Sequence, residues 1–160
     1  MKKLKTVLAV ALAVCLVVPG AIMLVGCSKF HKGTVVGNTY KYSGMTFNFV
    51  DDEEKKLYLD GETQEECEKS AKDLEISLIF KTKTEFAYKY TDPVNGTVAD
   101  YYYYDLNSDN IMIWYQDEQK AKRIFNEEDN VEIVVSKNFR TISIIEHCKN
   151  GGTVTTTFKA

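Results

Sequence analysis

Residues 85–105, EFAYKYTDPVNGTVADYYYYD, contain the two strands and the turn that decide the fold. Aromatic and β-branched residues fill 85–91 and 97–105, and such residues favour strands. Between the two runs, Asp92-Pro93-Val94-Asn95-Gly96 combines a proline with Asn-Gly, which is strong turn chemistry. The stretch therefore predicts a β-hairpin.

Similar runs continue on both sides of this hairpin. Residues 39–49 alternate apolar with polar or small side chains, and a period of two indicates a strand. Further strands are predicted at 76–80, 111–116, 121–126, 131–137, 140–148 and 153–158. About 8–9 short strands separated by turn residues predict a mainly β domain, an antiparallel up-and-down barrel or a sandwich. The acidic stretches 51–54 and 127–129 are interpreted as solvated turns.

One short helix is expected near residues 63–75. Thr63-Gln64-Glu65-Glu66 is a capping box, which marks the start of a helix. After it, apolar residues recur at helical spacing and form one inward face: Cys67, Ala71, Leu74 and Leu78.

The N-terminal 26 residues have the pattern of an export signal. Three lysines at positions 2, 3 and 5 precede a run without charges from Val7 to Val25. A cleaved secretory signal, a single membrane-spanning helix and a lipoprotein signal all begin this way. Pro19 and Gly20 interrupt the run and disfavour a permanent helix, because both are poor in a helix interior.

The end of this run decides among the three. Leu24, Val25, Gly26 and Cys27 resemble the lipobox of bacterial lipoproteins. That resemblance implies cleavage after Gly26 and a diacylglyceryl group, carrying fatty acids such as palmitate, on the Cys27 sulfur. Two acyl chains hold a protein durably on a membrane. We therefore expect a helical signal peptide at 1–26, a flexible tether at 27–38 and a domain at 39–160, on the extracytoplasmic face of the cell membrane.

The charge of the mature chain limits its partners. Without residues 1–26 it has 17 basic residues against 23 acidic ones. Such an acidic chain without a basic stripe is not expected to bind nucleic acid, nor to add electrostatic attraction to anionic lipids.

A resemblance extends over most of residues 36–160. The opening Val36-Gly37-Asn38-Thr39-Tyr40, the helical insert, the meander and the closing Thr155-Thr156-Thr157-Phe158-Lys159 resemble the lipocalin-like domains of lipoproteins from Gram-positive bacteria. The Gly-x-Trp opening of classical lipocalins is absent. The resemblance implies an up-and-down barrel, with room for an apolar interior, and no catalytic residues.

The aromatic residues of the central strands are the candidate binding residues. Strand alternation places Tyr102 and Tyr104 on one face, and with Trp114 they are the expected lining of a ligand cavity. Ordinary cross-strand pairing is the alternative explanation for these rings. Two further cysteines, Cys67 and Cys148, form a disulfide or remain two thiols.

Nothing in the sequence predicts catalysis or a metal site. His147 and Cys148 are neighbours on a strand and point to opposite faces, so they do not form a nucleophile and base. The acidic stretches lack the spacing of a calcium loop, and no cofactor is expected. We therefore expect a non-catalytic, membrane-anchored module that binds a small apolar or amphipathic ligand or an envelope component. The alternative is a structural protein with a solid core that docks a protein partner.

Overall fold

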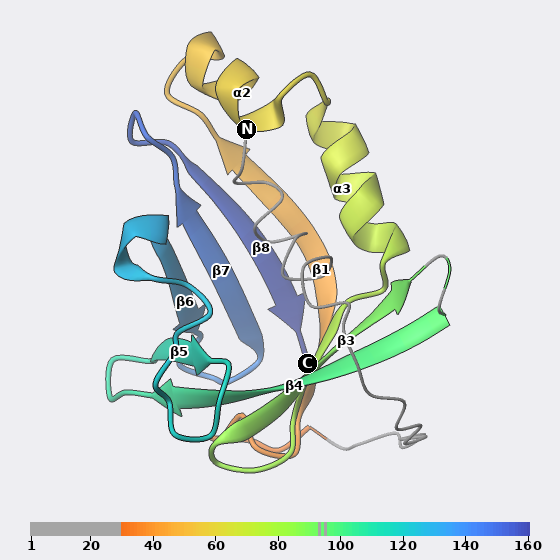
Figure 1. Ribbon diagram of the computed structural model, residues 1–160, viewed down its shortest axis with the longest axis vertical. Coiled ribbons are helices and arrows are strands. Elements are labelled where there is room, and N and C mark those ends of the chain that lie inside the picture. The colour runs from red at the N-terminus through yellow and green to blue at the C-terminus, as the bar shows by residue number, and fades with distance from the viewer. Residues whose placement is uncertain (1–29, 93, 95) are drawn as a thin grey trace.

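The computed structural model describes residues 30–92, 94 and 96–160, which form a closed antiparallel barrel of eight strands in chain order (Figure 1). The strands are β1 (Thr39–Asn48), β2 (Ser77–Phe80), β3 (Glu85–Asp92), β4 (Gly96–Leu106), β5 (Ile111–Tyr115), β6 (Val131–Val135), β7 (Thr141–His147) and β8 (Thr153–Lys159). Because β1 pairs with both β2 and β8, no sheet edge is left open. The predicted β-barrel is confirmed, and the alternative, a β-sandwich, is wrong. The predicted signal peptide, the lipobox and Cys27 lie outside the described residues.

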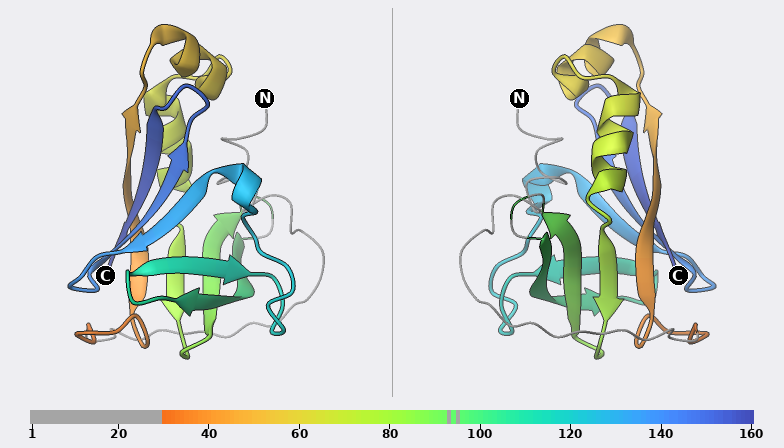
Figure 2. Two further views of the ribbon diagram at one scale, coloured as in Figure 1. Left: turned by 90° about the vertical axis from the view of Figure 1, so that its left-hand side faces the viewer. Right: turned by 90° about the vertical axis from the view of Figure 1, so that its right-hand side faces the viewer.

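The helix predicted near 63–75 is present as α3 (Gln64–Asp73). Thr63 is its N-cap: the Thr63 hydroxyl accepts a hydrogen bond from the Glu66 amide, and the Glu66 carboxylate accepts one from the Thr63 amide. Cys67 and Ala71 are buried, and α3 packs along the outside of β1 (Figure 2).

A second helix, α2 (Asp52–Leu59), replaces the solvated turn expected at 51–54. The Asp51 side chain accepts the Glu54 amide at 2.7 Å and caps this helix, so the acidic residues occupy its first turn. Negative charge is favourable there, because helix N-termini carry partial positive charge. The Glu54 carboxylate is buried and accepts backbone N–H groups of Val50, Asn150 and Gly152, which ties α2 to the turn between β7 and β8.

The strand predicted at 121–126 is not formed. Only Arg123 pairs there, in an isolated bridge with Tyr115. The Asp117 carboxylate accepts hydrogen bonds from the amides of Ala121 and Lys122. These bonds form a turn where the strand would begin. Residues 116–130 are therefore one long connection, with a short 3-10 helix η1 (Glu127–Asp129).

The tether expected to run to residue 38 is ordered from residue 31 onward. The Asn38 side chain is buried; its amide nitrogen donates to the carbonyls of His31 and Thr34, and its oxygen accepts the His31 amide. Val35 is buried in the core, and the Gly37 amide donates to the Phe80 carbonyl at 2.8 Å. These contacts fold residues 31–38 against the barrel.

Because the strands alternate in direction, their connections gather at two ends. Residues 30–38, 81–84, 107–110 and 136–140 form one end, which we call the basal end. The helices, the β7–β8 turn and the start of β6 lie toward the other, distal end (Figure 1).

Inward-facing side chains fill the barrel with aromatic rings. Tyr102 and Tyr104 are buried, whereas Tyr101 is 41% exposed, so strand β4 directs the even-numbered tyrosines inward. Phe86, fully buried on β3, makes ring contacts with Phe80, Tyr102, Tyr104 and Trp114.

Candidate functional site: the cavity beside Trp114

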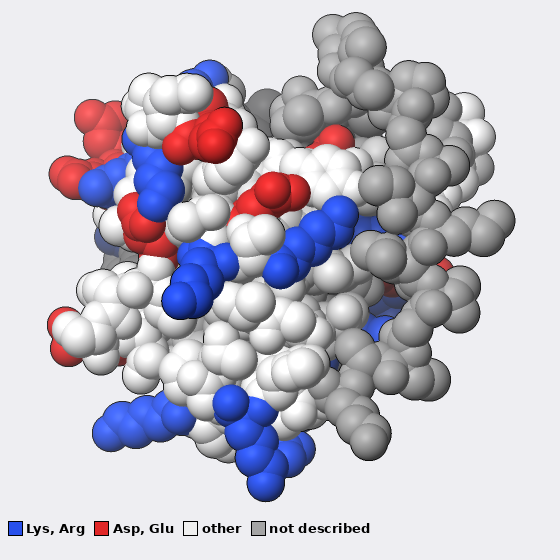
Figure 3. Space-filling view, turned by 90° about the horizontal axis from the view of Figure 1, so that it is seen from below, with Lys and Arg blue, Asp and Glu red and all other residues white. Residues whose placement is uncertain are grey.

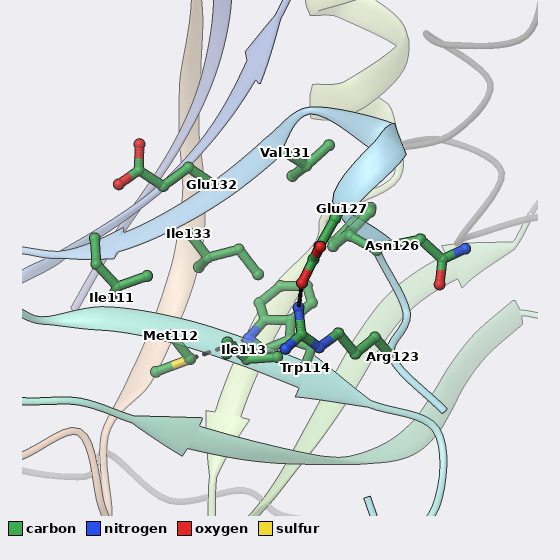
Figure 4. A pocket seen from close by; sticks show the side chains of 11 residues that line it. Ile111, Met112, Ile113, Trp114, Arg123, Asn126, Glu127, Val131, Glu132 and Ile133 are labelled. Carbon is green, nitrogen blue, oxygen red and sulfur yellow. Dashed lines mark hydrogen bonds and ion pairs between the residues drawn. The ribbon is translucent and has the colours of Figure 1, made fainter. Parts of the chain in front are cut away.

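A cavity of about 220 Å³ lies between β5 and β6 (Figure 4). These two strands pair only at Ile111–Val134 and Met112–Ile133. Farther along they diverge, and the connection 116–130 passes beside the gap. The cavity therefore exists because β5 leaves the ladder early. Its lining residues are Ile111, Met112, Ile113, Trp114, Arg123, Phe125, Asn126, Glu127, Val131, Glu132 and Ile133.

The aromatic part of the lining is fixed in place. Trp114 and Phe125 lie with ring centroids 6.0 Å apart, and both side chains are buried. The indole N–H of Trp114 donates to the Met112 sulfur at 3.0 Å, and the Trp114 carbonyl accepts the Ile124 amide at 2.9 Å. A rigid apolar wall with few polar groups is typical of small-molecule sites.

Four residues of the lining are polar, Arg123, Asn126, Glu127 and Glu132, and two of them form an ion pair. Arg123 Nη1 donates to Glu127 Oε1 at 3.3 Å, and Figure 4 shows the two side chains reaching toward each other. The Glu127 side chain is 88% exposed, so the pair lies at the solvent side of the site. Because exposed ion pairs are weak, the guanidinium can exchange Glu127 for an anionic group of a ligand.

The structure brings the three predicted cavity residues together only indirectly. Tyr102, Tyr104 and Trp114 all face the interior and all contact the Phe86 ring. Trp114 lines the cavity, whereas the two tyrosines pack in the core without lining it. Phe125 and Arg123 were not among the predicted lining residues, because residues 121–126 were expected to form a strand. An aromatic residue two positions after an arginine in a polar stretch is a weak sequence sign of such a site.

A polar group lies inside the barrel on β4. The Tyr102 hydroxyl and Asp100 Oδ2 are buried, and neither has a hydrogen-bond partner among the described residues. Burial raises the pKa of the Asp100 carboxyl, and burial followed by the Asp100 charge raises the pKa of Tyr102 to about 12. The two oxygens retain hydrogen-bonding capacity toward the interior.

A second polar cluster lies near the helices. The Tyr58 hydroxyl donates to the buried Glu146 carboxylate at 2.9 Å. Burial, then the Glu146 charge, raises the pKa of Tyr58, and Cys148 and Cys67 act on it in the same direction. Both cysteines are present as thiols rather than as the disulfide considered from the sequence. Burial and a hydrogen bond to Glu62 raise the pKa of Cys67 to about 12, so its thiol is unsuited to nucleophilic chemistry.

The remaining groups give no sign of a metal centre. His147, expected to lie apart from Cys148, faces Glu132, with 3.8 Å between Nε2 and Oε2. Within the described ranges, no three His, Cys, Asp or Glu side chains gather closely enough to hold a metal ion.

Comparisons with known proteins place the chain in no group. No protein-family model matches it, and no curated protein matches its sequence. No helix in the described part of the chain is long and apolar enough to cross a membrane.

Proposed function

We propose that the chain is a lipoprotein, anchored through Cys27 on the extracytoplasmic face of a bacterial membrane, that binds a small amphipathic ligand without converting it. The cavity beside Trp114 carries the binding part of this proposal, since it joins an aromatic wall to the Arg123 guanidinium. Its volume of about 220 Å³ is below the roughly 300–1,000 Å³ of pockets for drug-sized ligands, so it suits a smaller molecule, and the guanidinium favours one that bears a carboxylate or another anionic group. The closed up-and-down barrel agrees with the lipocalin-like resemblance of the sequence.

Binding is tested by titration of the protein with octanoate, a lysolipid and a hydrophobic anionic dye. Trp114 is the sole tryptophan and touches the cavity, so an occupant should change its fluorescence saturably. Val131→Phe, which fills the cavity, should abolish the change. Val134→Phe is the matched control, because Val134 lies on the same strand and does not line the cavity. Equal responses in the two variants would place the ligand elsewhere.

The anchor is tested separately by detergent phase partitioning of wild type and Cys27→Ala. Wild type should enter the detergent phase, and the variant should lose cleavage after Gly26 and lipidation. A variant that is processed and partitions like wild type would refute the lipoprotein part of the proposal.

A second candidate function has its own support. Apart from the cavity, ring contacts around Phe86 pack the interior, as expected of a barrel that acts through its outer surface. If no probe gives a saturable response, docking of a protein partner at the cell surface becomes the better proposal.

A further inference from the structure

Charge is distributed unevenly along the barrel, although the domain is acidic as a whole. The connections of the basal end carry one acidic residue, Asp109, and five basic ones: Lys32, Lys81, Lys83, Lys137 and Arg140. Residues 49–76 and 148–152, which join the strands at the distal end, carry eleven acidic residues against five basic ones. The connection 116–130, with five acidic residues against three basic ones, reaches back toward the basal end, where Lys120 pairs with Asp105 (Figure 2). Figure 3 shows the basal end: acidic side chains lie mixed with Lys and Arg in the upper left of the view, and the bottom of the view carries Lys and Arg without acidic side chains.

The basic side chains of the basal end are available for an external partner. Lys32, Lys83, Lys137 and Arg140 are exposed. Among the described residues, none of the five basic side chains forms an ion pair. Lys81 lies over the Tyr101 ring, 4.3 Å from its centroid, and the Arg140 guanidinium lies 4.8 Å from the centroid of Phe30. Such contacts hold a cation in place and leave its charge unneutralised.

The chain itself brings this end close to the lipid, if Cys27 carries the anchor as proposed. Phe30 follows Cys27 by three residues, which span at most about 11 Å. Because residues 31–38 are folded against the barrel, no longer tether separates the anchor from the basal end. Charged headgroups act over a Debye length of about 8–10 Å, which is comparable to this reach.

We propose that the basal end is a docking surface for anionic phospholipid headgroups, and that it holds the barrel with its helices directed away from the membrane. This inference rests on the proposed lipid anchor for its geometry, and on the charge distribution for its chemistry. It replaces the expectation, drawn from net charge alone, that the protein part adds no attraction to anionic lipids.

The test is lysine footprinting of the mature lipidated protein on vesicles. The protein is reconstituted on phosphatidylcholine vesicles with or without about 30% phosphatidylglycerol, and acylation of each lysine by a water-soluble ester is followed by mass spectrometry. Lys83 and Lys137 should react about threefold or more slowly on the anionic vesicles than on the neutral ones. Lys55 and Lys149, away from the basal end, should react equally on both. About 0.5 M salt should remove the difference, because it screens exposed charges.

Variants separate this surface from general charge effects. Lys83→Gln/Lys137→Gln/Arg140→Gln should abolish the protection of the remaining basal lysines, Lys32 and Lys81. The matched triple variant Lys55→Gln/Lys56→Gln/Lys149→Gln should retain it. Equal footprints on anionic and neutral vesicles would overturn the proposal while leaving the anchor intact.

Failure of the anchor is recognised independently, by protein that does not float with neutral vesicles. Lysine acylation is then measured with the unanchored protein added to anionic vesicles in solution. Protection of Lys83 and Lys137 would still support the docking surface, and its absence would refute it.

Discussion

Phe86→Ala should be among the most damaging single changes in this domain. Phe86 is fully buried at the centre of the barrel, stacked on Phe80 with ring centroids 5.2 Å apart. Trp114 lies 4.8 Å from it, and Tyr102 and Tyr104 lie 5.7 and 6.2 Å away. One ring therefore links the two predicted tyrosines to the wall of the cavity.

The expected loss of stability is large compared with the total. Truncation of a buried phenylalanine to alanine costs about 3–5 kcal/mol, from lost transfer free energy and the space left behind. Domains of this size unfold with about 5–15 kcal/mol. The four ring contacts place Phe86 toward the upper part of that range, since aromatic pairs add about 0.5–1.5 kcal/mol each beyond area burial.

Urea unfolding, followed by Trp114 fluorescence and by far-ultraviolet circular dichroism, measures this loss. With a slope of about 1–3 kcal/mol per molar urea, the midpoint should fall by about 2 M. Tyr101→Ala is the control, because Tyr101 points outward from the neighbouring strand, and it should cost about 1 kcal/mol or less. If both variants lose the same small amount, the interior is not packed around Phe86 and the reasoning fails.

Three further experiments test other parts of the structure: a pH titration, a thiol assay and a substitution. Burial raises the pKa of Tyr40, Tyr102 and Tyr104 to about 12, from an ordinary value of 10.0. Their contribution to stability is complete below pH 10 and is lost as pH rises toward 12; tyrosinate absorbance that appears before unfolding would contradict this. In the native protein at neutral pH, Cys67 should resist a thiol reagent, because burial raises its pKa to about 12. Counting thiols in residues 28–160 after unfolding without reductant should give two, and a count of none would instead show the disulfide between Cys67 and Cys148 that the sequence left open. Thr63→Ala removes the cap of α3 and should lower stability by about 1 kcal/mol, with Thr63→Ser, which keeps the hydroxyl, close to wild type.

Much of the barrel followed from local chemistry. Alternation and turn residues located all eight strands with small boundary errors, and the capping box at Thr63 located α3. The helix α2 was missed, because 52–59 has no apolar stripe and its start resembles a solvated acidic turn. A strand was wrongly predicted at 121–126, because its residues favour a strand. In the structure, the Asp117 carboxylate instead accepts hydrogen bonds from the amides of Ala121 and Lys122, where the strand would begin.

The candidate binding residues show the same division. Strand alternation put Tyr102 and Tyr104 on one face, and closure of the barrel decided that this face is the interior. The cavity depends on where β5 and β6 part, which no local pattern encodes. Phe125 and Arg123 reach it from an irregular connection, so their positions relative to Trp114 arise only from the folded chain.

By itself, the sequence determined the kind of most elements, the interior and exterior face patterns and the resemblance to a lipobox, because each of these depends on neighbouring residues. The tertiary structure alone decided which residues meet around Phe86, where the ladder opens beside Trp114, and that scattered basic residues share one end. Those features depend on pairing between strands far apart in the chain, and alternating strand direction sorts the connections to opposite ends of the barrel. The five basic residues of the basal end lie on separate connections of an acidic chain, and only the closed barrel brings them to one end.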